Sequence, residues 1–186
     1  MFKVIGLSGK AGSGKDHIAS RIITPHYGYV PFSLAWHIKT SLIGKTACTY
    51  EEAFVTKPPR VRHLLQQEGT ESGRDIYGKD IWLDTAFAWM QLVYEQWGIA
   101  RFVVPDVRFP NEVEYIKRKG GKVLRIIAPN RVAGSPLSME ARMHRSETAL
   151  DDYPPDNYDG LLDNDIGSED TLTDRVYHTL KTLDLL

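Results

Sequence analysis

A glycine-rich segment near the start of the chain constrains the fold more than any other feature of the sequence. It reads Gly9-Lys10-Ala11-Gly12-Ser13-Gly14-Lys15-Asp16 and fits the pattern G-x-x-x-x-G-K. An apolar run typical of a strand precedes it over residues 2–8, and a helical pattern follows from residue 16. Glycines at this spacing let backbone amides turn inward around phosphate oxygens, and Lys15 adds a cation. The segment therefore predicts a strand, a phosphate-binding loop and a helix.

The rest of the chain alternates between strand and helix patterns. Strands are expected at residues 29–32, 101–106, 122–127 and 160–163, and helices from residue 33, within 50–69, at 80–97, at 111–119 and at the C-terminal end. Asp80 is expected to cap its helix, residues 70–79 to form a loop, and Pro105 to lie at a strand end. Strands that alternate with helices over short connections predict an α/β fold, with a mostly parallel sheet and helices on both faces.

Length and composition narrow the class of protein. With 186 residues, 42% of them hydrophobic, the chain is expected to form a single domain, residues 1–186. No apolar run approaches the roughly 18–20 residues that cross a bilayer, and Cys48 is the only cysteine, which excludes an internal disulfide and a multi-cysteine metal site. We therefore expect a cytoplasmic protein.

The charge is unevenly distributed along the chain. The net charge is −1, but 21 basic and 14 acidic residues up to position 150 give +7, and 2 basic and 10 acidic residues beyond it give −8. This asymmetry indicates either an acidic, solvated tail beside an ordinary body or a basic site for a small anionic substrate.

Two aspartates are candidate ligands for Mg²⁺. Asp16 stands where such loops usually carry Ser or Thr, so it either holds or orients hydrated Mg²⁺ as an oxygen ligand or caps the following helix. Asp106, at the end of a strand that is apolar on both faces, is a candidate for contact with Mg²⁺ or with a phosphate acceptor. The alternative is a surface turn capped by Asp106 and Asn111.

Cationic and aromatic residues elsewhere are candidates for the acceptor side of the site. Arg142 and Arg145 follow a stretch with Pro and Gly, which suits a lid around residues 129–150 that carries cations over a transferring phosphoryl group, or else a solvated helix face. Arg74 is suited to a forked contact with an acceptor phosphate. Trp36 and Lys39 lie one helical turn apart, so either both face the acceptor or Trp36 is core and Lys39 is surface.

Several segments carry a resemblance to a known family. They are residues 7–16, 64–66, 69–71 with Arg74, 106–112, 120–121, 144–147 and 164–167. Together they resemble the phage-type deoxynucleoside monophosphate kinases, a branch of the P-loop nucleoside monophosphate kinase superfamily. The pair Lys15-Asp16, unusual in phosphate loops at large, is familiar in this family. Pro105 before Asp106, and Lys10 within the loop, are departures from the family's pattern.

The resemblance implies a three-layer α/β/α P-loop kinase fold with a small lid. It also implies that the γ-phosphate of ATP passes to a deoxynucleoside 5′-monophosphate, with Mg²⁺ required. In this resemblance Arg142 and Arg145 are lid arginines that act in catalysis with Lys15, and Arg74 and Arg108 lie on the acceptor side. The loop that contains Asn164 and Gly167 is similar to part of the adenine surround.

The expected partners are small nucleotide substrates, with no nucleic acid and no membrane, and a homodimer stays open. If the chain is phage-encoded, the expected location is the cytoplasm of the host cell. Two alternatives remain. One is a P-loop kinase for another small acceptor, of the dephospho-coenzyme A or phosphomevalonate type, because such kinases exchange acceptors by variation of the lid. The other is an ATP-binding module without transfer chemistry.

Overall fold

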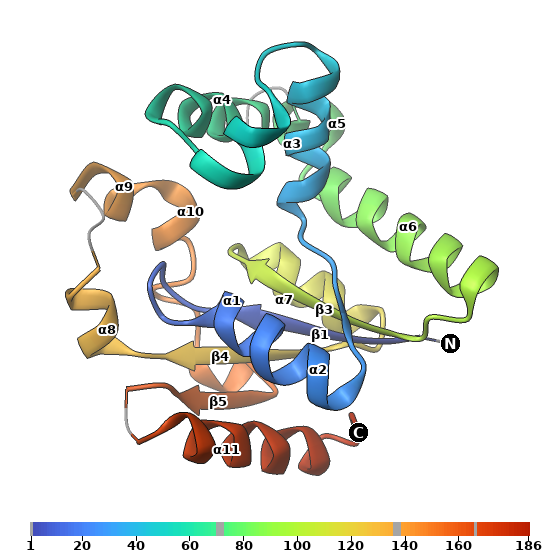
Figure 1. Cartoon of the computed structure of the whole chain (residues 1–186), viewed down its shortest axis with the longest axis vertical. Helices are drawn as coiled ribbons and strands as arrows, with labels where there is room; N and C mark the ends of the chain where they lie inside the picture. The colour runs from blue at the N-terminus through green and yellow to red at the C-terminus, as the bar shows by residue number, and fades with distance from the viewer. Residues whose placement is uncertain (1, 70–72, 136–138, 166) are drawn as a thin grey trace.

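The parallel sheet predicted from the sequence is confirmed. The computed structural model describes residues 2–69, 73–135, 139–165 and 167–186, without the side chains of residues 140 and 141. Within these residues the strands form one sheet in the order β2 (Val30–Pro31), β3 (Arg101–Val107), β1 (Lys3–Ser8), β4 (Lys122–Ile127) and β5 (Gly160–Asp163), and every pair is parallel. The carboxyl ends of the strands therefore share one edge (Figure 1).

Helices cover both faces of the sheet. The helix after the glycine-rich loop is continuous through α1 (Lys15–His17), η1 (Ile18–Ile23) and α2 (Thr24–Tyr27), and Gly28 in a left-handed conformation ends it. This helix and α11 (Glu169–Thr182) cover one face, where their side chains pack on Ile5, Leu7 and Leu124. The three-layer arrangement follows from strands that are apolar on both faces.

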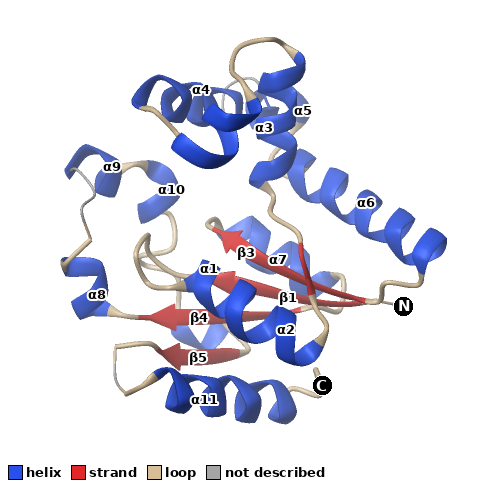
Figure 2. Cartoon of the chain, viewed as in Figure 1, coloured by secondary structure: helices blue, strands red, loops and turns tan. Residues whose placement is uncertain are grey.

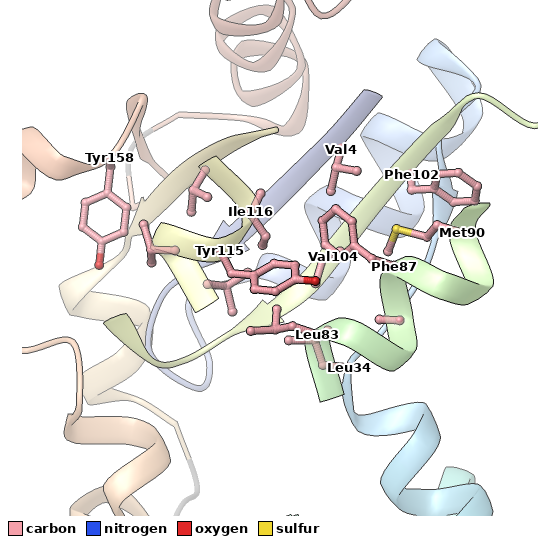
Figure 3. Close-up of a cluster of buried hydrophobic side chains, with 14 of the residues drawn as sticks. Val4, Leu34, Leu83, Phe87, Met90, Phe102, Val104, Tyr115, Ile116 and Tyr158 are labelled. Carbon is pink, nitrogen blue, oxygen red and sulfur yellow. The ribbon is translucent and has the colours of Figure 1, made fainter. Parts of the chain in front are cut away.

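The opposite face carries α6 (Ile81–Trp97) and α7 (Pro110–Arg118) (Figure 1). Side chains from both helices meet those of β1 and β3 in a continuous core (Figure 3), which includes Val4, Leu83, Phe87, Met90, Phe102, Val104, Tyr115 and Ile116. Leu83, Phe87 and Met90 of α6 are therefore core residues, whereas Trp97 at the end of the helix is exposed.

Short helices lie beyond the carboxyl edge of the sheet (Figure 2). On the side of β3 are α3 (Ala35–Gly44), η2 (Glu52–Thr56), α4 (Pro59–Gly69) and α5 (Asp75–Tyr77), of which α3, η2 and α4 pack around Leu42, Ala53 and Val61. On the side of β4 are α8 (Pro129–Ala133), α9 (Met139–Met143) and α10 (Arg145–Thr148), followed by η4 (Pro155–Asn157). The resembling residues 70 and 71, and part of the proposed lid, 136–138, lie outside the described residues.

Two local predictions are wrong, and a third holds only in part. β3 extends to Val107, so Pro105 lies inside the strand, and the pairing with β1 shifts register between Gly6 and Ser8, which accommodates a residue without an amide hydrogen. Asp80 occupies the N-cap position of α6 as predicted, but its side chain makes no cap hydrogen bond and instead accepts one from Asn111 Nδ2 (2.8 Å). The segment read as a loop contains α5.

The structure also bears on membrane insertion. No helix in the described part of the chain combines the length and the apolar surface needed to cross a bilayer.

Candidate phosphate-binding site

The glycine-rich loop joins β1 to α1 at the carboxyl edge of the sheet. Gly12 and Gly14 have φ angles of 87° and 91°, a left-handed conformation that favours glycine. The Ser13 amide donates to the Lys10 carbonyl (3.1 Å), whereas the described chain offers no hydrogen-bond partner to the amides of Gly12 and Gly14. Two backbone donors beside the start of a helix can therefore bind an anion.

Lys15 brings a buried cation to this loop. Its Nζ donates to the carbonyl oxygens of Gly9 (2.7 Å) and Lys10 (2.9 Å), and only 7% of the residue is exposed. Burial lowers the pKa of Lys15 to about 8, with a further lowering by the charge of Arg108, and nearby carboxylates, led by that of Glu147, oppose the shift. An anion at the loop would stabilise the charged form of Lys15.

Asn164 forms a hydrogen bond with the backbone of the phosphate loop. Its buried Nδ2 donates to the Ser13 carbonyl (2.8 Å), and its own amide donates to Ile127 (2.8 Å). A Cβ on Gly14 would lie 2.2 Å from this Nδ2, so Gly14 is required by space as well as by conformation. The structure thus gives Asn164 a role in holding the loop. Gly167 lies next to the start of α11, with a φ of 90°.

Glu147 connects the loop to the end of β3. Its Oε2 accepts a hydrogen bond from the Ala11 amide (2.8 Å), and its Oε1 forms an ion pair with Arg108. Lys10 donates to the Glu147 carbonyl (2.6 Å) and pairs with Asp151. The α10 segment is therefore fastened to the front of the loop by both charged and neutral hydrogen bonds.

Asp106 lies at the end of β3 and holds the start of α3. Its carboxylate accepts hydrogen bonds from Ser33 Oγ (2.7 Å), the Leu34 amide (3.0 Å) and the Ala35 amide (2.9 Å). These amides lie at the N-terminus of the helix, where no backbone acceptor is available to them. Asp106 thus positions the helix that carries Trp36 and Lys39.

Arg74 is fixed at the turn between β3 and α7. It forms an ion pair with Glu112, and its guanidinium lies 4.1 Å from the ring centroid of Phe109. The other Glu112 oxygen accepts from the amides of Arg108 (2.6 Å) and Phe109 (3.1 Å). Arg145 approaches the same ring, at 5.9 Å from its centroid. The structure therefore brings Arg74 and Arg145 to one aromatic side chain.

Trp36, Lys39 and Arg142 are the remaining residues that the sequence predicted for the site, and each contacts a different part of the protein. Trp36 is 37% exposed and lies beside Phe32, and Lys39 Nζ is 4.6 Å from the Phe54 ring centroid, so Trp36 is not a core residue. Arg142 donates to the Ser135 carbonyl (2.7 Å) near the end of α8. A Cβ on Gly12 would lie 3.1 Å from the Ser135 Cβ, so Arg142 binds a residue that borders the phosphate loop.

Asp16 and Asp106 differ in how well they suit Mg²⁺. Asp16, in the first turn after the loop, is exposed, whereas the oxygens of Asp106 already accept three hydrogen bonds. No group of three or more His, Cys, Asp or Glu side chains suited to a metal occurs among the described residues. Mg²⁺ at phosphate sites commonly uses one or two carboxylates together with phosphate oxygens and water. Asp16 fits such a site.

Asn164 is predicted from the sequence to lie beside the nucleotide, and Glu112 and Glu147 fall within the resembling segments, but the sequence does not predict the hydrogen bonds by which these three residues hold the site. Glu112 had a local signal, because a glutamate in the first turn of a helix commonly accepts backbone amides. No local pattern indicated the hydrogen bonds of Glu147 and Asn164, since their loop partners lie 136 and 151 residues away in the sequence.

Comparison with known proteins adds two viral relatives. The chain is 31% identical over 153 residues to protein ORF77 of Ictalurid herpesvirus 1 (strain Auburn), which is uncharacterized; the match covers 80% of this chain and 59% of that protein. It is 28% identical over 144 residues to a protein of Acanthamoeba polyphaga mimivirus that is provisionally named a deoxynucleotide monophosphate kinase. That match covers 68% of this chain and 74% of the mimivirus protein. The chain thus spans about three fifths of the length of the herpesvirus relative. No protein-family model matches it.

Solved structures agree on the fold. A shikimate kinase from Bacteroides thetaiotaomicron superimposes with a TM-score of 0.52 at 16% identity and covers all of both chains. A dephospho-CoA kinase from Campylobacter jejuni gives a TM-score of 0.53 at 17% identity over 97% of both chains. The chain therefore has the α/β fold of the P-loop kinases and is distantly related to a viral protein named for nucleotide phosphorylation.

Proposed function

We propose that this protein transfers the γ-phosphate of ATP to a deoxynucleoside 5′-monophosphate, giving ADP and the corresponding diphosphate. The observation that carries the proposal is the loop at the carboxyl edge of the sheet, where the amides of Gly12 and Gly14 have no hydrogen-bond partner among the described residues and lie beside the buried ammonium of Lys15. Phosphoryl transfer depends mainly on the position of the phosphates and the neutralisation of their charge, and this loop supplies both.

The acceptor assignment is supported by charge and by the mimivirus relative. Arg74 and Arg145 lie beside Phe109, and Lys39 and Trp36 project from α3 near the same edge of the sheet. Guanidinium groups suit an acceptor phosphate, and exposed aromatic rings suit a base. We assign to the acceptor side Arg74, Arg108, Lys39, Trp36 and Asp106. Asp106 would act indirectly, through the hydrogen bonds by which it positions the N-terminus of α3.

The ATP side of the proposal rests on residues 9–16, with Asn164 and Gly167 flanking the loop. Mg²⁺, when bound to Asp16 and the phosphates, would neutralise charge on the phosphate chain. Residues 129–150 form the proposed lid. Arg142 donates to the carbonyl of Ser135, which borders Gly12, and from this segment its guanidinium would act on the phosphates.

A turnover assay tests the proposal. Purified protein with ATP, Mg²⁺ and each of the four common deoxynucleoside monophosphates should form ADP and a deoxynucleoside diphosphate with at least one of them. Lys15→Met should reduce kcat by roughly a hundredfold or more, because it removes a positive charge at the transferring phosphoryl group. Both products should be identified by chromatography, which separates transfer from ATP hydrolysis.

Other acceptors serve as competitors in the same assay. Dephospho-coenzyme A, shikimate and 5-phosphomevalonate should give no ADP above background. Turnover with one of these and with none of the deoxynucleotides would contradict the assigned substrate class. Tight ATP binding without any acceptor-dependent ADP formation would contradict transfer chemistry altogether.

A further inference from the structure

One carboxylate joins three segments that lie far apart in the sequence. Glu147, in α10, accepts the Ala11 amide at the front of the phosphate loop through Oε2 and pairs with Arg108, after β3, through Oε1. The Glu147 side chain is only 10% exposed. A carboxylate so far removed from water requires hydrogen-bonded partners, and here they are one amide and one guanidinium.

The Glu147 carboxylate holds the Arg108 guanidinium close to the backbone of the phosphate loop. Both oxygens of Glu147 belong to one carboxyl group, so a guanidinium bound to one oxygen stays beside the amide bound to the other. That amide belongs to Ala11, the residue before Gly12, whose own amide is unbonded within the described chain. Arg108 is therefore held next to the donors that a phosphate chain would use.

We propose that Glu147 is a positioning residue that fixes the Arg108 guanidinium at the mouth of the phosphate loop, where its charge faces the phosphoryl group in transit. This inference rests on the proposed kinase function. Glu147 acts through Arg108, and a negative charge in contact with the phosphates themselves would oppose binding.

Electrostatics explain why a carboxylate is needed at this position. Arg108 and Lys15 are two cations close enough for the Arg108 charge to lower the pKa of Lys15, and Glu147 is the strongest opposing influence. Without Glu147, repulsion from Lys15 would drive the Arg108 side chain toward solvent. Ser146 Oγ adds a longer contact to Arg108 (3.4 Å), and the Lys10 ammonium anchors the Glu147 backbone (2.6 Å).

A double-mutant cycle tests the inference. Glu147→Gln keeps an oxygen for the Ala11 amide but removes the charge that holds Arg108, and Arg108→Gln removes the guanidinium. Each single variant should lower kcat by roughly tenfold or more, and the double variant should lose no more than Arg108→Gln alone. In Glu147→Gln, the affinity for ADP, measured by calorimetry, should stay within about twofold of the wild type, because Glu147 does not touch the amides of Gly12 and Gly14.

Matched variants control for charge and folding. Asp152→Asn removes an equal charge from an exposed position on the same segment and should keep kcat within about twofold. Glu147→Asp keeps the charge but shortens the side chain, so it cannot reach both partners and should lower kcat by roughly threefold or more. Thermal unfolding establishes that each variant is folded, and Glu147→Asp decides the question if Glu147→Gln does not fold.

Three results would overturn the inference. Additive losses in the double variant would show that Glu147 acts independently of Arg108. A parallel loss of ADP affinity would show that Glu147 only maintains the shape of the loop. Tighter ATP binding with unchanged kcat would show that its carboxylate competes with phosphate.

A measurement without turnover separates this inference from the proposed function. The Arg108 Nε–Hε signal in the NMR spectrum, assigned by its absence in Arg108→Gln, should be distinct in the wild type and move to the position of solvated arginines in Glu147→Gln. If the wild type phosphorylates no acceptor, the proposed function fails while this result can still hold. An Arg108 signal unaffected by Glu147→Gln would refute the positioning role even in an active enzyme.

Discussion

Lys15 is a residue whose protonation we expect to respond to a bound anion. Its ammonium is buried against two carbonyl oxygens, which stabilise it less than water does, and Arg108 adds a like charge. A polyphosphate beside Nζ would supply the missing negative charge. The binding of a nucleotide and the protonation of Lys15 are therefore coupled.

This coupling predicts proton uptake on nucleotide binding. In the free protein the pKa of Lys15 is about 8, lowered by burial from 10.5, so at about pH 8.5 much of the side chain is neutral. Bound phosphate raises the pKa again, so ADP binding at that pH should take up roughly half a proton or more, and almost none at about pH 6.5, where Lys15 is already charged. Calorimetry in buffers of different ionisation enthalpy measures the uptake.

Lys15→Arg is the control for this experiment, because the guanidinium stays charged across the whole range. The uptake should vanish in this variant. Uptake that persists with Arg at position 15, or that is equal at both pH values, would show that another group titrates.

At the scale of elements, the contact between Asp106 and α3 determines how the acceptor side is presented. Asp106→Ala leaves the Leu34 and Ala35 amides and the Ser33 hydroxyl without their acceptor, and should lower the free energy of unfolding by about 1–3 kcal/mol. Urea unfolding monitored by tryptophan fluorescence measures the loss.

Asp16→Asn is the matched control, since it removes an equal charge from an exposed site in the first turn of α1. It should change stability by less than about 0.5 kcal/mol and instead raise the Mg²⁺ concentration needed for turnover. Equal stability in the two variants, with Mg²⁺ dependence altered only in Asp106→Ala, would reverse the roles given to these carboxylates.

The elements readable from the sequence were those with a local pattern. β4 and β5 occupy the predicted residues because apolar runs between turn residues define a buried strand, and the phosphate loop was recognisable from its glycine spacing. The links of Asp106 to α3, and of Glu147 to the loop, span 72 and 136 residues, and no local pattern encodes such pairs. Residues 139–148 form two short helices, of which α10 contacts the phosphate loop through Glu147.

At the scale of the whole molecule, the residues of the proposed site lie along the carboxyl edge of the sheet. The loop after β1, the end of β3 and the segments after β4 and β5 converge there (Figure 2), as expected of ligand sites in open parallel sheets. The acidic surplus lies in residues 151–186, which supply β5 and α11, so the phosphate loop and its cations belong to the basic part of the chain.

The most direct test of this account is an NMR titration of glycine-labelled protein with ADP and Mg²⁺. Among the 15 glycines, the amide signals of Gly12 and Gly14 should shift most, because their hydrogens gain phosphate acceptors. The signals of Gly98 and Gly120, which precede β3 and β4 at the opposite edge of the sheet, should not shift. Saturating ADP that leaves Gly12 and Gly14 unshifted would contradict the claim that this loop binds the phosphate chain.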